Sequence, residues 1–357
     1  MKILSHYFSR RLTLLFTTAL LILAGLSWMT QILALMKFIV QYGTDVGSFL
    51  GMTMLMFPLI VSVILPYVSF IAVLFAYNQM IGDSEVPVMM GAGLSPAQLA
   101  IPALRLTAII MAFHYCLTLW AIPASQQRLS DVQWNMRYGL ANLKIQDSTF
   151  TQLANGLVAF VEESSGSTLK NMMISDTRGG NEMVVMGKTG QLIKTDRGIT
   201  LAMRSGMMQS KSGNLANGTF EEYDMDMNMT ESREGAGFRA RQIPTIRLFG
   251  MEGFDTLNTG QRKKFVSEIG NRLLAPLMNL LLALIALNCL LKTSLLRRAF
   301  SISLPLAIFG LIISQSMFMA AMNETGGSIS SLYLTAAIQF AAILALFYNL
   351  SRSPHNA

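Results

Sequence analysis

The sequence contains few of the residues that build catalytic centres or disulfide frameworks. Its 357 residues include only two cysteines and three histidines, and 13% of them are charged, whereas 52% are hydrophobic. Cys116 and Cys289 lie inside long apolar runs, where a thiol is typical of a small buried hydrophobe and cannot staple a soluble domain. So few charges in a chain of this length indicate an integral membrane protein.

Histidine is absent from the polar middle of the chain. His6, His114 and His355 lie before, within and after the apolar runs, so neither a Ser-His-Asp triad nor an HExxH zinc site can be assembled in the middle segment. The stretch MGKTG at Met186–Gly190 lacks a glycine at the spacing of a phosphate-binding loop, since Gly180 lies two residues too far away. We expect no enzymatic activity, no cofactor and no metal, and we interpret His114 as a packed neutral imidazole rather than a proton relay.

Apolar runs long enough to cross a membrane, which takes about 20 helical residues, recur along the chain. They lie at roughly 12–36, 53–80, 97–121, 269–291, 299–322 and 330–350. The first run is too long for a signal peptide and no small-residue cleavage site follows it, so we expect it to be an anchor. The sequence therefore predicts six transmembrane helices.

Lysine and arginine mark one side of these runs. Basic residues precede the first run, separate the fourth from the fifth, and follow the sixth, at Lys2, Arg10, Arg11, Lys292, Arg297, Arg298 and Arg352. Because basic flanks remain in the cytoplasm, we expect both termini there and residues 124–268 outside. The net charge of +7 divides into +1 for residues 124–268 and +6 for the remainder, so it belongs to membrane boundaries and does not indicate nucleic-acid binding.

The external segment has the pattern of β-structure. Short alternating apolar runs are separated by turn residues such as Arg178–Asn181 and Lys211–Asn214. Regular short strands favour an all-β sandwich or jelly roll. The predicted domains are 1–123 with three transmembrane helices, 124–268 with the jelly-roll-like domain, and 269–357 with three further transmembrane helices.

The stretch GDSEVPVMMGAGLSP between the second and third runs predicts a short cytoplasmic helix at about 84–92. Ser84 is suited to the N-cap, Glu85 to the first turn near the positive end of the helix dipole, and Gly93 to the left-handed residue after the helix. Ser95 and Gln98 then form a capping-box pattern that opens the next helix.

The loop thus carries start and stop signals for two helices, more than a simple connection needs, and this favours a helix that docks into the groove of a partner. Its apolar side chains, which we expect to be exposed, are Val86, Val88, Met89 and Met90. The alternative is a helix lying on lipid. That alternative is opposed by the acidic residues and by the absence of Lys and Arg, since the cytoplasmic leaflet is anionic.

With these residues the chain resembles the lipopolysaccharide export permeases LptF and LptG. The family pattern between the second and third spans is carried by Leu65-Pro66, Ser84-Glu85, Val88-Met89, Gly91 and Gly93-Leu94-Ser95, and a second match at the fourth span by Glu268, Arg272 and Pro276. Residues 149–164 are more similar to the LptF branch than to the LptG branch. Gly91 replaces the alanine usual in the family, and Pro87 is unusual there.

The resemblance implies a permease subunit of an ABC-type complex in the bacterial inner membrane. It would extract lipopolysaccharide from the outer leaflet and pass it to a periplasmic β-jelly-roll bridge, with ATP hydrolysed in a partner and the first and fifth spans forming a lateral gate. The implied partners are an LptB-like ATPase dimer, a paralogous LptG-like permease, a single-span LptC-like protein, the bridge protein and the lipid. The implied ATPase-docking residues are Ser84, Glu85, Val86, Val88, Met89, Met90 and Gly93.

Two basic residues at external span ends, Lys37 and Arg272, are candidates for contact with lipid phosphates. Snorkelling to headgroups is an equally good interpretation of both. Glu268 lies four residues before Arg272, so the two can pair on one helix face, which contributes only ~0.3–0.5 kcal/mol if the pair is exposed. Two other functions remain open: a force-transmitting ABC-type permease with a non-lipid substrate, and a non-transport membrane scaffold that presents a β-domain.

Overall fold

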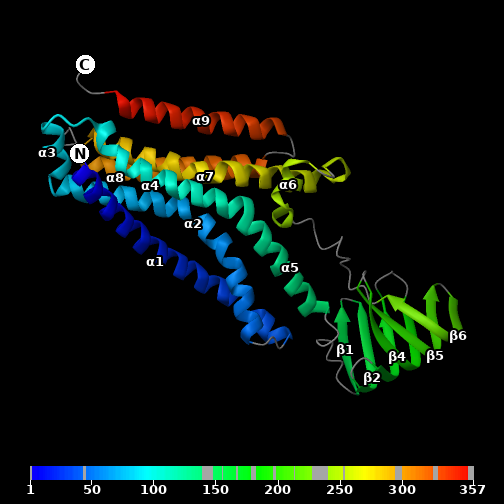
Figure 1. Cartoon of the computed structure of the whole chain (residues 1–357). Coiled ribbons are helices and arrows are strands. Elements are labelled where there is room, and N and C mark those ends of the chain that lie inside the picture. Colours follow the sequence, from blue (N-terminus) through cyan, green and yellow to red (C-terminus); the bar gives the residue numbers. More distant parts are fainter. Residues whose placement is uncertain are drawn as a thin grey trace. The chain divides into compact units, whose positions relative to one another are not determined.

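A computed structural model of the chain describes residues 2–42, 46–138, 148–154, 156–165, 168–177, 182–195, 198–212, 214–226, 240–251, 254–293, 300–324 and 329–352. At the ends of some stretches, including 37–42 and 134–138, only the backbone is described. The chain divides into two compact units (Figure 1). A helical unit comprises Met1–Lys37, Val46–Leu129 and Arg239–Ala357, and a β unit comprises Phe38–Asp45 and Ser130–Phe238.

The helical unit is built from long apolar helices. Its elements, of which α1 and α5 run on into residues of the β unit, are α1 (Lys2–Tyr42), α2 (Val46–Gly82), α3 (Glu85–Gly91), α4 (Pro96–Cys116), the π-helix η1 (Leu117–Ala121), α5 (Ile122–Tyr138), η3 (Ala240–Gln242), α6 (Thr245–Phe249), η4 (Phe254–Thr256), α7 (Thr259–Thr293), α8 (Phe300–Glu324) and α9 (Ile329–Ser351). Within the described residues, six segments are long and apolar enough to cross a membrane. They coincide with the six predicted runs, so this prediction is confirmed.

Two of these helices form the centre of the unit. In the most apolar stretch of each helix, 72% of residues are buried in α2 and 67% in α7, against 17% in α1, 6% in α8 and 11% in α9. The largest core joins α2 and α7 to Phe8 and Leu12 of α1, Val86 of α3 and Leu99 of α4. The helices α1, α8 and α9 therefore present most of their apolar side chains outward, away from this core.

The β unit is an antiparallel sheet, which confirms the inserted β-domain. Its strands are β1 (Thr149–Ala154), β2 (Leu157–Ser165), β3 (Thr168–Asp176), β4 (Glu182–Thr195), β5 (Gly198–Ser212) and β6 (Asn214–Asp226), and each pairs with its neighbours in sequence. The described strands thus make one sheet in meander order. The connectivity of a two-sheet jelly roll, with strands crossing between sheets, is not found among them.

The alternation of inward and outward side chains is interrupted along one line that crosses five strands of the sheet, β2 to β6. At Glu162, Asn171, Lys188, Ser205 and Glu221 the ladder lacks a pair, although the register is the same on both sides. Along β3 the buried positions step from Leu169 to Met172, three residues apart, and Asn171 has φ 46°. Irregular positions of this kind bend strands. The residues buried together on the inner face of the sheet are Leu157, Ala159, Val161, Leu169, Met172, Ile174, Val185, Leu201, Met203 and Met225.

Candidate functional site

The loop between α2 and α4 is ordered around the short helix α3. Ser84 takes the N-cap position, but its φ is 62° and its side chain makes no capping hydrogen bond, so the predicted side-chain cap is wrong. Gly93 has φ 93°, and Gly93 N and Leu94 N donate to the carbonyls of Met90 and Met89, which is the left-handed helix stop that the sequence predicted. Ser95 opens α4 with a complete capping box.

The acidic residues of this loop bind α1. Arg11 donates through Nη2 to Asp83 Oδ2 at 3.2 Å and through Nη1 to Glu85 Oε1 at 3.3 Å. Tyr7 Oη donates to the same Glu85 oxygen at 3.1 Å. Glu85 Oε2 is buried and has no hydrogen-bond partner in the described part of the chain. The described contacts of the Glu85 carboxylate thus fall on one oxygen, and they tie the start of α3 to α1.

The apolar side chains of α3 divide between the core and the surface. Val86 was expected to be exposed, but it is completely buried against the end of α2, because the loop folds its first turn inward. Met89 and Met90 are partly buried against the same core, and Val88 is 69% exposed. The apolar surface of α3 therefore includes Val88, Pro87 and the outer parts of the two methionines.

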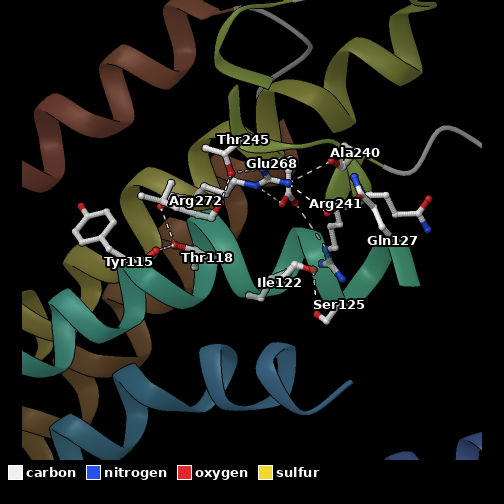
Figure 2. Close-up of polar contacts among 12 residues, drawn as sticks. Tyr115, Thr118, Ile122, Ser125, Gln127, Ala240, Arg241, Thr245, Glu268 and Arg272 are labelled. Atoms are coloured by element: carbon white, nitrogen blue, oxygen red, sulfur yellow. Dashed lines mark hydrogen bonds and ion pairs between the residues drawn. The ribbon is translucent and has the colours of Figure 1, made fainter. Parts of the chain in front are cut away.

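A second cluster surrounds Arg272 on α7 (Figure 2). Its side chain is among the largest fully buried ones, and its Nε donates to Glu268 Oε1 at 2.9 Å, one helical turn away. Its Nη1 donates to Thr245 Oγ1 at 3.0 Å, and its Nη2 donates to the carbonyl of Arg241 at 3.2 Å, with that of Ala240 at 3.5 Å. The guanidinium thus joins α7 to residues 240–245, where the chain returns from the β unit.

The π-helix η1 completes this cluster from the other side (Figure 2). Thr245 Oγ1 donates to the carbonyl of Leu119, and Thr118 Oγ1 donates to the carbonyl of Arg272 at 3.3 Å. Tyr115 Oη donates to the carbonyl of Leu273 at 2.8 Å. Wide π turns leave backbone groups open to such partners and are frequent at functional sites. Sequence patterns gave no indication of Thr118, Thr245 or the π turn.

Arg241 was also missed by the sequence patterns. Its Nε lies 3.8 Å from Glu268 Oε2, and its side chain is 57% exposed. Together with Glu268, Arg272, His114 and Gln315 it lines a cavity of about 370 Å³ between α2, α4, α7 and α8. The cavity has polar groups at Arg241 and Glu268 and apolar walls that include Met319 and Phe318, so it could accept an amphiphilic group.

His114 lies in a buried polar network between three helices. Its Nε2 is 2.8 Å from Ser62 Oγ on α2, and its Nδ1 is 2.9 Å from Asn279 Nδ2 on α7. Ser69 Oγ donates to Asn279 Oδ1 at 3.3 Å. An amide nitrogen only donates, so Nδ1 accepts and the ring donates through Nε2, which fits a neutral imidazole. The side chain of Lys37 lies outside the described residues.

A metal centre finds no support in the described residues, which contain no group of three or more His, Cys, Asp or Glu side chains that could hold an ion. The predicted site residues fall into two separate places. Ser84 to Gly93 form α3 and its flanks, whereas Glu268 and Arg272 lie together inside α7, beside the C-terminal end of α4.

Comparison with known proteins identifies the family. Residues 6–352 match the family described as lipopolysaccharide export system permease LptF/LptG. An uncharacterised protein of Rickettsia prowazekii is 24% identical over 300 residues, which cover 82% of each chain. The lipopolysaccharide export system permease protein LptF of Escherichia coli is 29% identical over 142 residues, 38% of each chain. The family match spans both units, and the chain therefore belongs to the LptF/LptG family of lipopolysaccharide export permeases, multi-pass proteins of the inner membrane.

Proposed function

We propose that this chain is the LptF-type permease subunit of an ABC-type export complex, which extracts lipopolysaccharide from the outer leaflet of the inner membrane. The observation that carries the proposal is the family match over residues 6–352, together with the shorter similarity to LptF of Escherichia coli. The chain itself is a transport subunit. An LptB-like ATPase dimer supplies the energy, and an LptG-like permease completes the membrane part.

In the proposed orientation both termini and α3 face the cytoplasm, and the β unit faces the periplasm. Arg11 contacts the α3 loop, and Lys292 Nζ at the end of α7 donates to Asn349 Oδ1 near the end of α9. The ends of α2, α7 and α9 share one core with Val86. The basic residues therefore gather at the end of the helical unit that holds α3, which supports a cytoplasmic α3.

The ATPase would dock on α3. Val88 and the exposed parts of Met89 and Met90 offer an apolar ridge, and the side chain of Glu85, which is 27% exposed, offers its negative charge to an Arg or Lys of the ATPase. A helix that inserts an apolar ridge into a groove, with a charge beside it, is a common mode of recognition. Val86 would act from inside by fixing α3 to the core.

Lipid would enter along the outward faces of α1 and α8, which have few buried residues. For the phosphates of the headgroup we propose Lys37, and Arg241 as the half-exposed cation on the cavity. Direct phosphate binding by Arg272 has weaker support, because its donors already lie on protein acceptors. Arg272 would instead hold the returning segment in place beside the lipid path.

The β unit would receive the acyl chains and pass them to the periplasmic bridge and an LptC-like protein. Its inner face is continuously apolar, as a path for acyl chains requires. Within the described strands, β1 and β6 each pair on one side only. An open edge strand can extend its sheet into a like-folded partner.

The test is reconstitution of the chain with candidate ATPase and second permease in liposomes that contain lipopolysaccharide. We expect co-purification of the ATPase and ATP-dependent release of lipid to an added periplasmic acceptor. Hydrolysis without lipid release would favour a force-transmitting permease. If no ATPase associates, the chain is a scaffold and the proposal fails.

Glu85 gives the sharpest variant for this assay. Loss of one partner of a buried charge pair typically costs ~2–5 kcal/mol, which is at least about 30-fold in affinity. We expect Glu85→Arg to abolish ATPase co-purification and Glu85→Ala to weaken it, with insertion intact. Glu222→Arg, a charge reversal at an exposed pair of the β unit, is the matched control. Full assembly of Glu85→Arg would remove α3 as the docking element and restore the interpretation of a helix lying on lipid.

A further inference from the structure

Charged contacts join the N-terminal end of α1 to the loop that holds α3, which we call the docking loop. One guanidinium, that of Arg11, reaches the carboxylates on both sides of the start of α3, Asp83 at 3.2 Å and Glu85 at 3.3 Å. Arg11 Nη1 also donates to Tyr7 Oη at 3.2 Å, and Tyr7 in turn donates to Glu85. We propose that Arg11 is the positioning residue through which movement of the docking loop is transmitted to α1.

Apolar contacts make this end of α1 move with the loop. Phe8 and Leu12 of α1 are buried in the same core as Val86 of α3, and the ring of Phe8 lies 6.0 Å from that of Tyr77 on α2. The first three turns of α1, the end of α2 and α3 are therefore packed as one body. A displacement of α3 reaches α1 at Arg11 directly.

The rest of α1 is held much less firmly. One face rests on α2 through Ala24 and its neighbours, but most of the outer half is exposed, including Leu21, Ile22, Leu26, Met29 and Leu33. The hydrogen bonds described for α1 beyond Arg11 stay within α1 itself, as in the bonds of Thr13, Thr17 and Thr18 to carbonyls one turn back. A long helix fixed at one end and loosely packed along its length acts as a lever.

Glu85 connects this lever to the ATPase. Its Oε1 accepts from Arg11 and Tyr7, and its side chain remains 27% exposed. A cation of the ATPase that approaches this side chain would therefore act on the same carboxylate that holds α1. This step rests on the proposed docking of the ATPase at α3.

Arg11 is better suited to coupling than to stability. Its two ion pairs involve side chains that are 19%, 53% and 27% exposed, and pairs of this kind contribute little to folding. A fork-shaped guanidinium that binds two carboxylates does, however, fix direction as well as distance, which a lysine cannot do. Loss of Arg11 should leave the chain folded and change how α1 follows the loop.

The experiment uses the full chain assembled with its ATPase and second permease in nanodiscs. Cys116 and Cys289 are replaced by alanine, and spin labels are placed on the exposed residues Met29 of α1 and Tyr333 of α9. Distances are measured with and without trapped nucleotide, and lipid released per ATP hydrolysed is measured in parallel. The variants are Arg11→Gln and Arg11→Lys, and the matched control is Arg10→Gln, the exposed neighbouring arginine.

With Arg11→Gln, we expect the ATPase to co-purify, the nucleotide-dependent change in distance to shrink, and lipid released per ATP to fall at least about 5-fold, the lower end of typical coupling factors. Arg11→Lys should fall between this variant and the wild type, and Arg10→Gln should match the wild type. Exchange of the charges in Arg11→Asp with Asp83→Arg should restore part of the coupling. An unchanged distance change and lipid ratio in Arg11→Gln would overturn the proposal.

Failure of the docking proposal gives a different result. In that case the wild-type chain itself fails to bind the ATPase, whatever residue stands at position 11. If Arg11→Gln loses the ATPase to the same extent as Glu85→Arg, Arg11 only supports the fold of α3, and the transmission proposal is overturned while docking stands.

Discussion

The buried guanidinium of Arg272 should be required to hold the chain where it returns from the β unit. We consider Arg272→Met, which keeps an unbranched apolar side chain and removes every donor. In the native protein these donors reach Glu268, Thr245 and the carbonyl of Arg241 at 2.9–3.2 Å. The substitution leaves Glu268, a residue that is only 7% exposed, without its closest cation.

The expected cost follows from this burial. Removing one partner of a buried ion pair typically destabilises a protein by ~3–5 kcal/mol, because the other charge stays buried. Arg241 lies 3.8 Å from Glu268 Oε2 and can partly compensate, so we expect about 3 kcal/mol for Arg272→Met. An exposed pair on one helix face would contribute only ~0.3–0.5 kcal/mol, so the two situations are clearly separable.

A double variant separates the cost of an unpaired buried charge from the cost of losing the hydrogen bonds to residues 240 and 241. In Glu268→Met with Arg272→Met no buried charge remains, and such replacements are often neutral or stabilising. The backbone carbonyls of Ala240 and Arg241 still lose their donor, at ~1–3 kcal/mol for a buried group. The double variant should therefore be more stable than Arg272→Met but less stable than the wild type. Arg272→Lys should resemble the double variant, since lysine can meet Glu268 but cannot reach the carbonyls as a fork.

The assay combines thermal unfolding in detergent with hydrogen exchange of residues 240–251. Arg272→Met should lower the melting temperature and speed exchange in this segment, while the centre of α7 stays protected. Wild-type stability and wild-type exchange in Arg272→Met would refute the attachment role. If lipid crosslinking were lost under those conditions, direct phosphate contact by Arg272 would become the better explanation.

Two further predictions use matched positions. Val88→Asp, on the exposed part of α3, should weaken ATPase co-purification without loss of folding. Val86→Asp instead places a charge in the core and should unfold the loop. Equal effects of the two variants would contradict the division of α3 into a buried and an exposed face. Gly206→Ala should destabilise the β unit by ~1–3 kcal/mol, because the added methyl group meets a backbone carbonyl and an aromatic ring. The control is Gly218→Ala, whose added methyl group has no atom within 4 Å, so this variant should have the melting temperature of the wild type.

The membrane helices were predictable because length and apolarity alone determine them. A run of about 20 apolar residues has few alternatives to a helix, since hydrocarbon offers no hydrogen-bond partners to an open backbone. The stop at Gly93 and the capping box at Ser95 were predictable for a similar reason, because both are local and depend on residue type.

Burial of the site residues was not predictable in this way. Whether Glu268 and Arg272 are exposed depends on residues 240–245, which lie about thirty positions earlier in the chain. Val86 is covered by the end of α2, and a seven-residue helix is too short for its apolar face to be assigned from periodicity. Both are tertiary effects that a local pattern does not contain.

In the β unit, too, local sequence patterns predicted the strands but not how they bend. Alternation and turn residues predicted the strands, yet they gave no sign of the line of irregular positions that crosses β2 to β6. Asn171 and Ser205 both have positive φ there, and only asparagine is a residue that tolerates this conformation readily. A serine at such a position carries no sequence signal, so the curvature of the sheet could not be inferred.

The helical unit divides into parts joined by hydrogen bonds and parts joined by apolar contact alone, and this division bears on how a lateral gate can open. Among the described bonds, Ser62, His114 and Asn279 tie α2, α4 and α7 together, and Gln339 and Asn288 tie α9 to α7. For α1 the described bonds to other elements are those of Arg11 and Tyr7 at one end. Within a bilayer, lipid can replace an apolar helix contact at little cost, whereas a broken interhelical hydrogen bond leaves polar groups without partners. In the proposed cycle, α1 would therefore separate from its neighbours at little cost along its apolar length, and the charged contact at its end would determine when this occurs.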